Sequence, residues 1–399
     1  MSGTLRVALV GGGIGGLTAA VALARKGFEA HVFEQADRLR EIGAGIGLSP
    51  NALNVLRALG VEDDVRRCGS TPDAIVGCDW TSKRELFRVQ LKGVVESRFG
   101  AANVQIHRGD LLSILSANVP HSQIHLNSRC VAVSSSEYGA FLSFRDGRRE
   151  PFDVVVGCDG IRSTVRAATL GSELPRFTGN MCWRGLIDAD QLPPALLPFQ
   201  VTNWIGTGGH VVTYYVRGGA LVNVVAVRQT PDWIEESWSI PAETGDLVAA
   251  FSTVHRDLRT LLERARNCFK WGLFDRDPLP RWTTHRVTLL GDAAHPMLPF
   301  LGQGAAMAIE DAYVLARELA RTPDDVEAAV QAYEAERRPR TSRVQLTARE
   351  QARFLQVASP CGATLIEGRD ASPESDRLSN YAIDWLYQYD PTRGQDRTH

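Results

Sequence analysis

The sequence predicts an α/β fold in which a parallel sheet is interrupted by a second, β-rich unit and followed by a helical C-terminal region. Three stretches carry this prediction. An apolar strand, a glycine-rich turn and a helix follow one another from Leu5 to about Lys26. Residues 176–282 are rich in β-branched and aromatic residues with glycine and proline breaks, as in a sheet. From Ala305 to about Val357 the residues favour helix, with a break expected at Pro339.

Composition sets broad limits on the class of protein. With 399 residues and 44% hydrophobic content, the chain is long enough for two packed units with sizeable cores. A formal net charge of −2 provides no basic surface for nucleic acid. The seven cysteines are scattered, without a C-x-x-C pair, which predicts no metal site and favours reduced thiols in a cytoplasmic enzyme. The first strand begins at once and no apolar run is long enough to cross a membrane, so we expect neither signal peptide nor membrane anchor.

The N-terminal stretch is typical of a dinucleotide-binding unit. Residues 11–16 fit G-x-G-x-x-G between an apolar strand and a helix. A second strand, Ala30 to Phe33, ends at Glu34, which lies about 20 residues beyond the glycines, where such folds place the acid that binds the adenosine ribose. The residues that we therefore assign to cofactor binding are Gly11, Gly13, Gly16 and Glu34.

A second strand-to-helix connection lies between Val287 and Ala305. Its apolar strand runs into Gly291-Asp292, a proline-bounded loop and then Gly302-Gln303-Gly304 at a helix start. Free N–H groups and the positive helix end there suit an anionic ligand, whereas Asp292 would accept a hydrogen bond from a sugar hydroxyl. We assign Asp292, Gly302 and Gly304 to cofactor binding. Taken alone, this stretch is equally compatible with an ordinary strand–helix connection.

Between these two lies an apolar strand that leads from Phe152 into Asp159-Gly160 and a basic helix with Arg162 and Arg166. Taken alone, Asp159-Gly160 is a turn and the arginines form a solvated helix face. A second basic run, residues 337–340, follows two glutamates, and we expect it to be a solvated helix end.

Together the three segments resemble the single-component (group A) FAD-dependent aromatic hydroxylases, the para-hydroxybenzoate hydroxylase class. That family carries the dinucleotide motif first, then D-G-x-x-S-x-x-R, then G-D-A-A-H-x-x-x-P. Residues 159–166 and 291–299 match the last two patterns, in the same order. The resemblance covers nearly the whole chain and is strongest to salicylate hydroxylases, 3-hydroxybenzoate 6-hydroxylases and 6-hydroxynicotinate 3-monooxygenases.

The resemblance implies a Rossmann-like FAD-binding domain with an inserted β-sheet substrate domain and a helical C-terminal region. We assign residues 1–74, 100–175 and 283–345 to the first, 75–99 and 176–282 to the second, and 346–399 to the tail, whose Trp385 and Tyr387 should pack on the body. FAD is the implied cofactor, with NADH or NADPH as transient co-substrate near Arg162 and Arg166, and O2. A homodimer stays open as the state of assembly.

Further cofactor contacts follow from the resemblance. The loop from Arg38 to Gly47, including Gly45, should line the edge of the isoalloxazine ring, and Arg40 in it is a candidate for contact with the flavin or its phosphates. Arg108 matches a cofactor-contacting position in the pattern H-R-x-D-L, with an ion pair to Asp110 as the alternative. Asp159 is placed near the phosphates and ribitol.

The implied reaction is hydroxylation of a small phenolic acid through a flavin C4a-hydroperoxide. The loop from Pro296 to Gly304, whose path Pro296 and Pro299 fix, should help form a dry cavity. His210 and Tyr214 are four residues apart, so both point to one face of a predicted strand. A histidine with a pKa near neutrality could accept the phenolic proton. The alternative is a core histidine with a structural tyrosine, but the stretch resembles the family segment that lines the substrate pocket.

Departures from the family patterns bear on the substrate. Pro299 stands where 3-hydroxybenzoate 6-hydroxylases usually carry Gln, and Gly47 where a histidine helps to hold 6-hydroxynicotinate. Residues 297–299 and 209–225 look most like salicylate hydroxylase, which favours decarboxylating 1-hydroxylation of salicylate to catechol over those two alternatives. An FAD-dependent oxidase or dehydrogenase, or a non-catalytic flavin protein, is the alternative of another class. The candidates for the carboxylate anchor are Arg84, Arg184 and Arg217.

Overall fold

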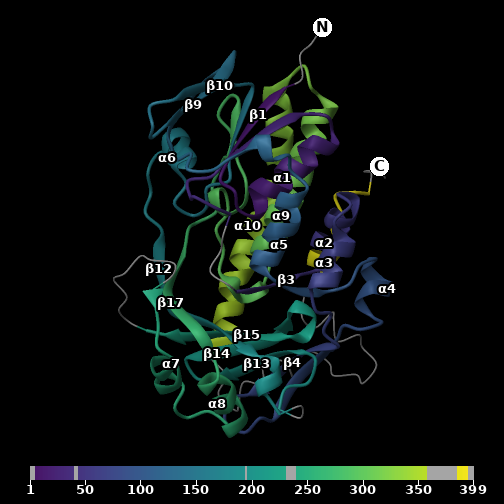
Figure 1. The fold of residues 1–399 in the computed structure, drawn as a ribbon, viewed down its shortest axis with the longest axis vertical. Coiled ribbons are helices and arrows are strands. Elements are labelled where there is room, and N and C mark those ends of the chain that lie inside the picture. Colours follow the sequence, from purple (N-terminus) through teal and green to yellow (C-terminus); the bar gives the residue numbers. More distant parts are fainter. Residues whose placement is uncertain (1–4, 40–43, 194–195, 231–239, 357–383, 394–399) are drawn as a thin grey trace.

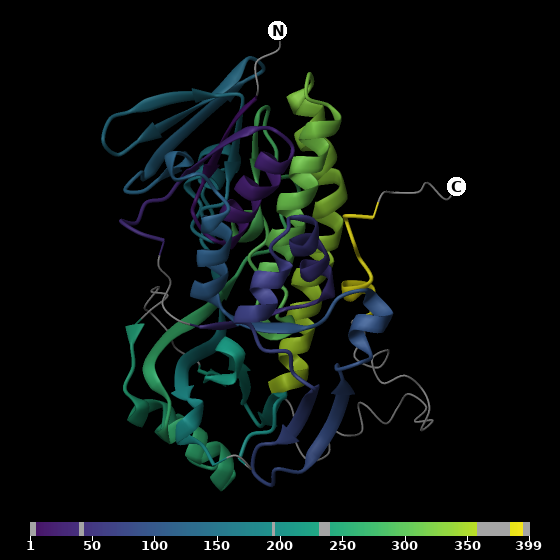
Figure 2. The same ribbon diagram turned by 45° about the vertical axis from the view of Figure 1, so that its right-hand side comes forward.

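The computed structural model describes residues 5–39, 44–193, 196–230, 240–356 and 384–393. Two sheet-based parts lie at opposite ends of the molecule, joined by a long helix (Figures 1 and 2). This arrangement confirms the predicted fold class. Within the described ranges, none of the helices combines the length and apolar character that crossing a lipid bilayer requires.

The first part is built on a five-stranded parallel sheet in the order β18-β11-β1-β2-β7. Its strands are β1 (Arg6–Val10), β2 (Glu29–Phe33), β7 (Ile124–His125), β11 (Val154–Gly157) and β18 (Val287–Leu289). They come from distant parts of the sequence, so this unit is discontinuous. The central strands are almost wholly apolar because parallel sheets are covered on both faces.

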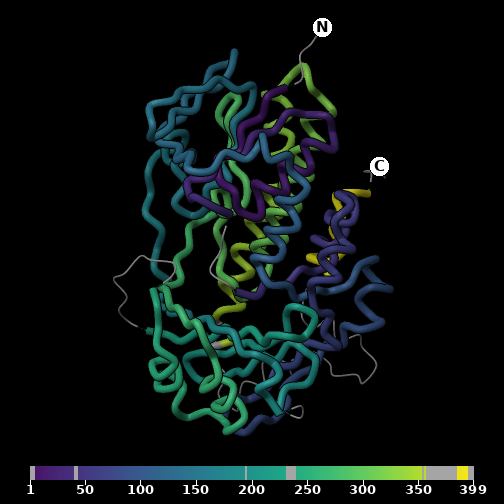
Figure 3. Tube along the Cα trace, viewed as in Figure 1, coloured from purple at the N-terminus to yellow at the C-terminus, as the bar shows by residue number. Residues whose placement is uncertain are grey.

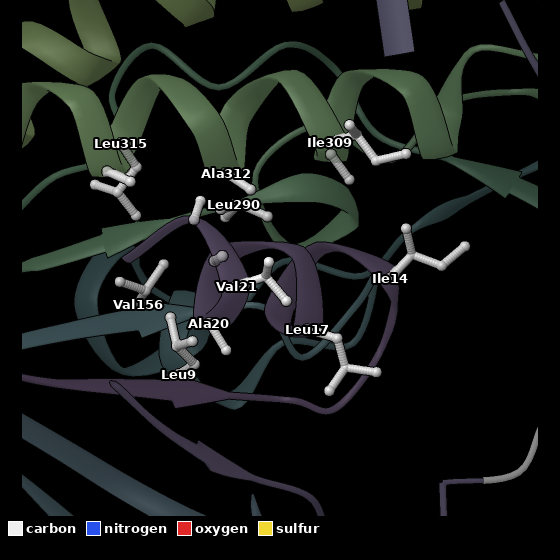
Figure 4. Packing of buried hydrophobic residues seen from close by; sticks show 14 of the residues in the cluster. Leu9, Ile14, Leu17, Ala20, Val21, Val156, Leu290, Ile309, Ala312 and Leu315 are labelled. Carbon is white, nitrogen blue, oxygen red and sulfur yellow. The ribbon is translucent and has the colours of Figure 1, made fainter. Parts of the chain in front are cut away.

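Helices α1 (Ile14–Arg25) and α9 (Gly304–Arg321) pack together over one end of this sheet. Figure 4 shows Ile14 and Val21 of α1 directed at the α9 side, where Ile309 and Ala312 lie. The approach is close, because a Cβ atom on Gly15 of α1 would lie 3.4 Å from the Cβ atom of Ala308 on α9. This packing brings the N-terminal ends of both helices to the same side of the sheet, next to the glycine motifs.

The second part is an eight-stranded sheet in the order β16-β17-β12-β15-β14-β13-β4-β5. Its strands are β4 (Ala74–Asp79), β5 (Glu85–Gln90), β12 (Arg176–Asp188), β13 (Val201–Gly206), β14 (Gly209–Val216), β15 (Leu221–Gln229), β16 (Ile240–Pro241) and β17 (Arg266–Asp275). All neighbours are antiparallel except β13 and β4. The chain contributes to this sheet twice, first with β4 and β5 and later with β12 to β17, after which it returns to the first part (Figure 3).

Smaller elements complete the fold. β8 (Cys130–Ser136), β9 (Gly139–Phe144) and β10 (Arg149–Phe152) form an antiparallel sheet, with a turn at Gly147, whose φ is +89°. The remaining helices of four or more residues before α9 are α2 (Pro50–Ala58), α3 (Glu62–Cys68), α4 (Val95–Phe99), α5 (Arg108–Ala117), α6 (Thr164–Leu170), α7 (Thr244–Ala250) and α8 (Arg256–Glu263). The predicted loop through Gly45 needs one correction, because β3 (Gly45–Leu48) pairs with β6 (Val104–His107) as a short strand.

The helix break expected at Pro339 is wrong. α10 (Val326–Gln356) runs straight through Pro339, and the break from α9 lies at residues 322–325. A proline inside a helix costs about 3 kcal/mol. Here Arg337 and Arg340, on either side of it, form ion pairs with Glu310 and Asp311 of α9. Arg337 is 0% exposed, so this run is also no solvated helix end, contrary to expectation.

The described C-terminal residues 384–393 pack on the body, which confirms the prediction for Trp385 and Tyr387. Arg340 donates hydrogen bonds to the carbonyl oxygens of Trp385 and Leu386, at 3.2 and 2.8 Å. The Tyr387 ring meets Phe99 edge-on, with 5.6 Å between ring centres. These residues, which include α13 (Asp384–Tyr387), thus cover the side of α10 that carries the buried arginines.

Candidate active site

The glycine turn between β1 and α1 allows close approach of the backbone to a ligand. Gly11 has a φ of +115°, and a Cβ atom there would lie 2.4 Å from the carbonyl oxygen of Cys158. A Cβ atom on Gly16 would lie 2.0 Å from the carbonyl oxygen of Gly11. Around Gly13, by contrast, a Cβ atom would meet nothing within 4 Å. Gly11 and Gly16 therefore serve the turn and the helix packing, while Gly13 leaves space at the positive end of α1 for a pyrophosphate.

Glu34 lies beside this turn, at the end of β2. Its carboxylate accepts hydrogen bonds from the N–H groups of Gly12 and Ala36, at 2.8 and 2.9 Å. These bonds fix the carboxylate next to the glycines. Its contact with an adenosine ribose stays a prediction.

The segment that begins at Asp159 caps helix α6. The Asp159 carboxylate accepts hydrogen bonds from Ser163 Oγ and from the N–H of Thr164, at 2.5 and 2.7 Å. Burial raises the pKa of Asp159, against the opposing effect of the Ser163 bond. Capping is thus the observed role of this carboxylate, and its contact with the cofactor stays a prediction.

The two arginines of this segment differ. Arg166 is 4% exposed and donates to the carbonyl oxygens of Ile161 and Ala293, at 2.5 and 3.1 Å. Burial lowers its pKa to about 10. Arg162 is exposed. The expected contact with the nicotinamide coenzyme therefore rests on Arg162, because the Arg166 guanidinium is used to tie α6 to the loop after β18.

Asp292 lies in that loop, just past the end of β18. Its side chain is accessible to solvent, yet burial of its surroundings raises its pKa, an effect that His295 and Arg108 partly offset. Arg108 thus lies close enough to influence Asp292, while both carboxylate oxygens of Asp110 bind Arg217, at 2.8 and 2.9 Å.

The glycine loop meets the eight-stranded sheet at Gly45. Its N–H donates to Asn223 Oδ1 at 2.7 Å. A Cβ atom on Gly45 would lie 2.6 Å from Tyr214 Cε2 and 2.8 Å from Asn223 Cγ. Only glycine therefore fits here, and the loop lies directly against two side chains of the sheet. The other candidate in this loop, Arg40, lies outside the described residues.

One face of the eight-stranded sheet is turned toward this loop. Cross-strand pairing aligns the following rows on it: Cys182–Val227–His210, Arg184–Val225–Val212 and Leu186–Asn223–Tyr214. Directly opposed residues share a face. The face is thus mostly apolar with four polar side chains, which is the usual composition of a small-molecule pocket.

Three polar atoms of this face are buried without a hydrogen-bond partner among the described residues. They are His210 Nδ1, Arg184 Nε and Asn223 Nδ2. An unpaired buried polar atom is costly and uncommon in native proteins. Three of them on one sheet face are groups that the polar atoms of a small ligand could satisfy.

His210 and Tyr214 are both uncharged at neutral pH. Burial lowers the pKa of His210 to about 4 and raises that of Tyr214 to about 12. The expected pKa near neutrality for His210 is therefore wrong, because the ring lies in an apolar setting with Phe300 edge-on at 5.3 Å. A neutral imidazole can accept a hydrogen bond from a phenol, and the Tyr214 hydroxyl can donate one.

The loop from Pro296 to Gly304 covers this face. Leu298 and Phe300 pack in the same apolar cluster as Val225 and Trp271. Gln345 of α10 donates to the Pro296 carbonyl oxygen at 3.0 Å, and Pro299 opens a short 3-10 helix that ends at Gly302, with φ +64°. The two prolines thus set the path of a loop that lies over this sheet face.

The three candidate anchors for a substrate carboxylate are distinguished by position. Arg217 is paired with Asp110, and Arg84 is exposed in the turn before β5. Arg184 is half-buried on the pocket face, with its guanidinium carbon 5.2 Å from the centre of the Trp271 ring. Of the three, only Arg184 shares its face with His210 and Tyr214.

Comparison with known proteins identifies the family of the chain. Residues 4–348 match the protein family described as "FAD binding domain". The chain is 39% identical over 386 residues to 3-amino-4-hydroxybenzoate 2-monooxygenase of Streptomyces platensis, covering 96% of both chains. This chain belongs to the group A FAD-dependent aromatic hydroxylases.

Two further relatives of this hydroxylase are informative. This chain is 38% identical over 349 residues to 6-hydroxynicotinate 3-monooxygenase of Bordetella bronchiseptica, and the match covers 86% of this chain and 91% of the relative. A solved salicylate hydroxylase in complex with substrate superposes with a TM-score of 0.82 at 28% identity, over 98% of this chain and 97% of the other.

The residues present fit FAD, the cofactor of the family. Two long helices, α1 and α9, begin at glycines, and a Cβ atom on Gly304 would meet nothing closer than Met297 Cγ at 4.0 Å. Both helix starts can donate N–H groups to anionic or carbonyl oxygens. Gly13 and Glu34 would hold the adenosine side in the hydroxylase, and Gly45, Asp292, Gly302 and Gly304 the flavin side.

Sequence reasoning missed two residues of the site, Asn223 and Gln345. The signal for Asn223 was present, because it is the only polar residue within the run Leu221–Val227 and lies at an inward position. Gln345 gave no such signal, since it lies in a helix with polar residues on all sides.

The depressed pKa of His210 predicts a pH dependence of stability. The folded-state pKa is about 4 against 6.5 for an unperturbed histidine, so between these values the unfolded chain binds more protons. Titration of His210 should therefore leave the free energy of unfolding unchanged above pH ~6.5 and lower it progressively as the pH falls toward ~4. In urea unfolding at pH 7.5 and 5, His210→Phe should lose less unfolding free energy on acidification than the wild type. The same change at exposed His121 is the control, and equal losses in the wild type and His210→Phe would contradict the assignment.

Proposed function

We propose that this hydroxylase acts on a small phenolic acid whose carboxylate lies at Arg184 and whose hydroxyl group lies at His210. NADH or NADPH and O2 are the co-substrates. The observation that carries the proposal is the pair of unpaired, buried nitrogens, Arg184 Nε and His210 Nδ1, on one apolar sheet face. A cation and a neutral imidazole are the groups that a carboxylate and a phenol require.

The spacing of these groups favours a hydroxyl group opposite the carboxylate. β12, which carries Arg184, is separated from β14, which carries His210, by β15. Two strand spacings and an offset of two residues along the strands separate the Cα atoms of Arg184 and His210 by about 12 Å, with Val225 and Val227 on the strand between them. A para-hydroxy acid places its polar groups at opposite ends of the ring, as do the 3-amino-4-hydroxybenzoate and 6-hydroxynicotinate for which the relatives are named.

Each residue then has a defined task. FAD, held by the glycine segments, would supply the redox chemistry by which one oxygen atom of O2 is added to the ring at the expense of NAD(P)H. His210 accepts the hydrogen bond of the substrate hydroxyl group and thereby raises the electron density of the ring. Tyr214 donates its own hydrogen bond and fixes the orientation of the substrate. The loop with Pro296 and Pro299 excludes water.

Salicylate is the second candidate. It is favoured by the loop residues Met297 to Pro299 and by the likeness to the solved salicylate hydroxylase. In salicylate the hydroxyl group is next to the carboxylate, so both would lie at one end of the pocket. Family membership speaks against the oxidase or dehydrogenase alternative.

The experiment follows oxidation of NADH and NADPH by the purified holoenzyme with five acids. They are 4-hydroxybenzoate, 3-amino-4-hydroxybenzoate, 6-hydroxynicotinate, 3-hydroxybenzoate and salicylate. Oxygen consumption and hydrogen peroxide formation are measured in the same reactions, and the products are identified by mass spectrometry. We expect matched oxygen use and a hydroxylated product with a para-hydroxy acid. Catechol from salicylate, with only peroxide from the para-hydroxy acids, would overturn the para assignment in favour of the second candidate.

A further inference from the structure

Three buried side chains form a closed ring of hydrogen bonds between two loops of the cofactor site. Ser49 Oγ donates to Asn51 Oδ1 at 2.6 Å, Asn51 Nδ2 donates to Gln303 Oε1 at 3.1 Å, and Gln303 Nε2 donates to Ser49 Oγ at 3.0 Å. Their exposed fractions are 3%, 0% and 3%. We call Ser49, Asn51 and Gln303 the amide clip.

The direction of these bonds is internally consistent. Each of the three residues donates once and accepts once around the ring, so turning the Gln303 amide over would set two NH2 groups against each other. Chains of hydrogen bonds in a buried setting strengthen one another. The amide clip therefore has one preferred arrangement and holds the two loops at a fixed separation.

The amide clip joins the two glycine segments assigned to the flavin side. Ser49 directly follows β3, whose Gly45 lies against Tyr214 and Asn223. Gln303 lies between Gly302 and Gly304 at the start of α9. Spacing between these segments sets the width available to a flat ligand between them.

The amide clip is also attached to a rigid base. Asn51 Nδ2 donates to Glu310 Oε1 at 2.5 Å. Glu310 is 0% exposed and is bound by Arg337 at 2.6 Å and by Arg340 at 2.8 Å. The clip is therefore fixed to the ion cluster between α9 and α10 rather than to a flexible surface group.

We propose that Ser49, Asn51 and Gln303 are positioning residues for FAD, which set the separation of the Gly45 and Gly302–Gly304 segments around the flavin ring. They act through the backbone of those segments. The proposal requires only that FAD binds and is independent of which acid is hydroxylated.

The test is Gln303→Leu, which keeps the approximate size of the side chain and removes both of its hydrogen bonds. We expect the Kd of FAD to be roughly tenfold larger than in the wild type. It is measured from the rise in flavin fluorescence when the purified holoenzyme is diluted. The visible absorption bands of the bound flavin should shift, and a larger share of NAD(P)H oxidation should end in peroxide.

A matched control is Gln200→Leu in the other part of the molecule. Gln200 is 9% exposed, donates to Thr202 Oγ1 at 3.1 Å and accepts from Arg88 at 3.4 Å. This variant should retain the FAD Kd and the flavin spectrum. If Gln303→Leu lowers the Tm as Gln200→Leu does but leaves Kd and spectrum unchanged, the proposal is overturned.

Gln303→Glu keeps the test decisive if the leucine variant does not fold. The introduced carboxylate can still accept from Asn51, but at neutral pH it cannot donate to Ser49 and lies near Glu310. Protonation restores a donor. FAD affinity relative to the wild type should therefore be low at pH 8 and recover at pH 5.5. An affinity ratio that does not change with pH contradicts the proposal.

Discussion

Arg337→Met is expected to lower the free energy of unfolding by about 3–5 kcal/mol, because it removes the buried cation that Glu310 and Asp311 share. Arg337, Glu310 and Asp311 are all 0% exposed, and the guanidinium lies 2.6 and 2.7 Å from the two carboxylates. Methionine fills similar volume, so the loss comes from charge rather than from a cavity. Arg340 remains as a partner for Glu310, and His295, at 2.5 Å, for Asp311.

The measurement is urea unfolding with saturating FAD, so that cofactor loss does not enter the comparison. Arg338→Met is the matched control, because Arg338 is the next residue of the same helix and pairs with Glu334 at 3.5 Å, with 39% of its side chain exposed. Its removal should cost less than about 1 kcal/mol. Equal losses in the two variants would show that the buried pairs contribute no more than a surface pair.

The pH dependence of stability tests the same buried ion pairs in a second way. Although burial opposes it, His295 and Arg337 lower the pKa of Asp311. A carboxyl group with a lowered folded-state pKa contributes stability above its unfolded pKa, and this contribution is lost as pH falls through the folded value. Without Arg337 the pKa of Asp311 rises, so the variant should already lose stability at a higher pH than the wild type.

The parts of the site that the sequence predicted are those with local signals. The G-x-G-x-x-G turn, the acid at Glu34 and the glycines before α9 each lie beside the strand or helix that positions them. His210 and Tyr214 were found because alternation along β14 determines which side chains share a face. In each case the position of the group is determined by a few residues that are neighbours in the sequence.

The parts that could not be predicted depend on contacts between distant residues. Arg337 stands in a polar run and gives the pattern of a solvated helix end, yet its partners lie 26 and 27 residues earlier, on α9. Pro339 breaks isolated helices, but here tertiary ion pairs override that preference. The low pKa of His210 likewise follows from burial beneath a loop that lies 90 residues further along, at Phe300.

Arg184→Met is expected to reduce kcat/KM for the carboxylated substrate roughly 10- to 100-fold, which corresponds to the loss of one charged hydrogen bond. Arg184 is half-buried on the pocket face, and its Nε has no partner among the described residues. A guanidinium can bind a carboxylate through two N–H groups at once, which a lysine cannot reproduce. Arg184→Lys should recover only part of the activity.

The decisive comparison uses the para-hydroxy acid and the corresponding phenol without a carboxylate, each followed by product formation. Arg184→Met should weaken turnover of the acid and leave that of the phenol nearly unchanged. Arg217→Met and Arg84→Met are the matched controls, because Arg217 is paired with Asp110 and Arg84 is exposed. Both should turn over the acid as the wild type does. An equal fall for acid and phenol in Arg184→Met would mean that Arg184 supports the pocket through Trp271 rather than binding the carboxylate.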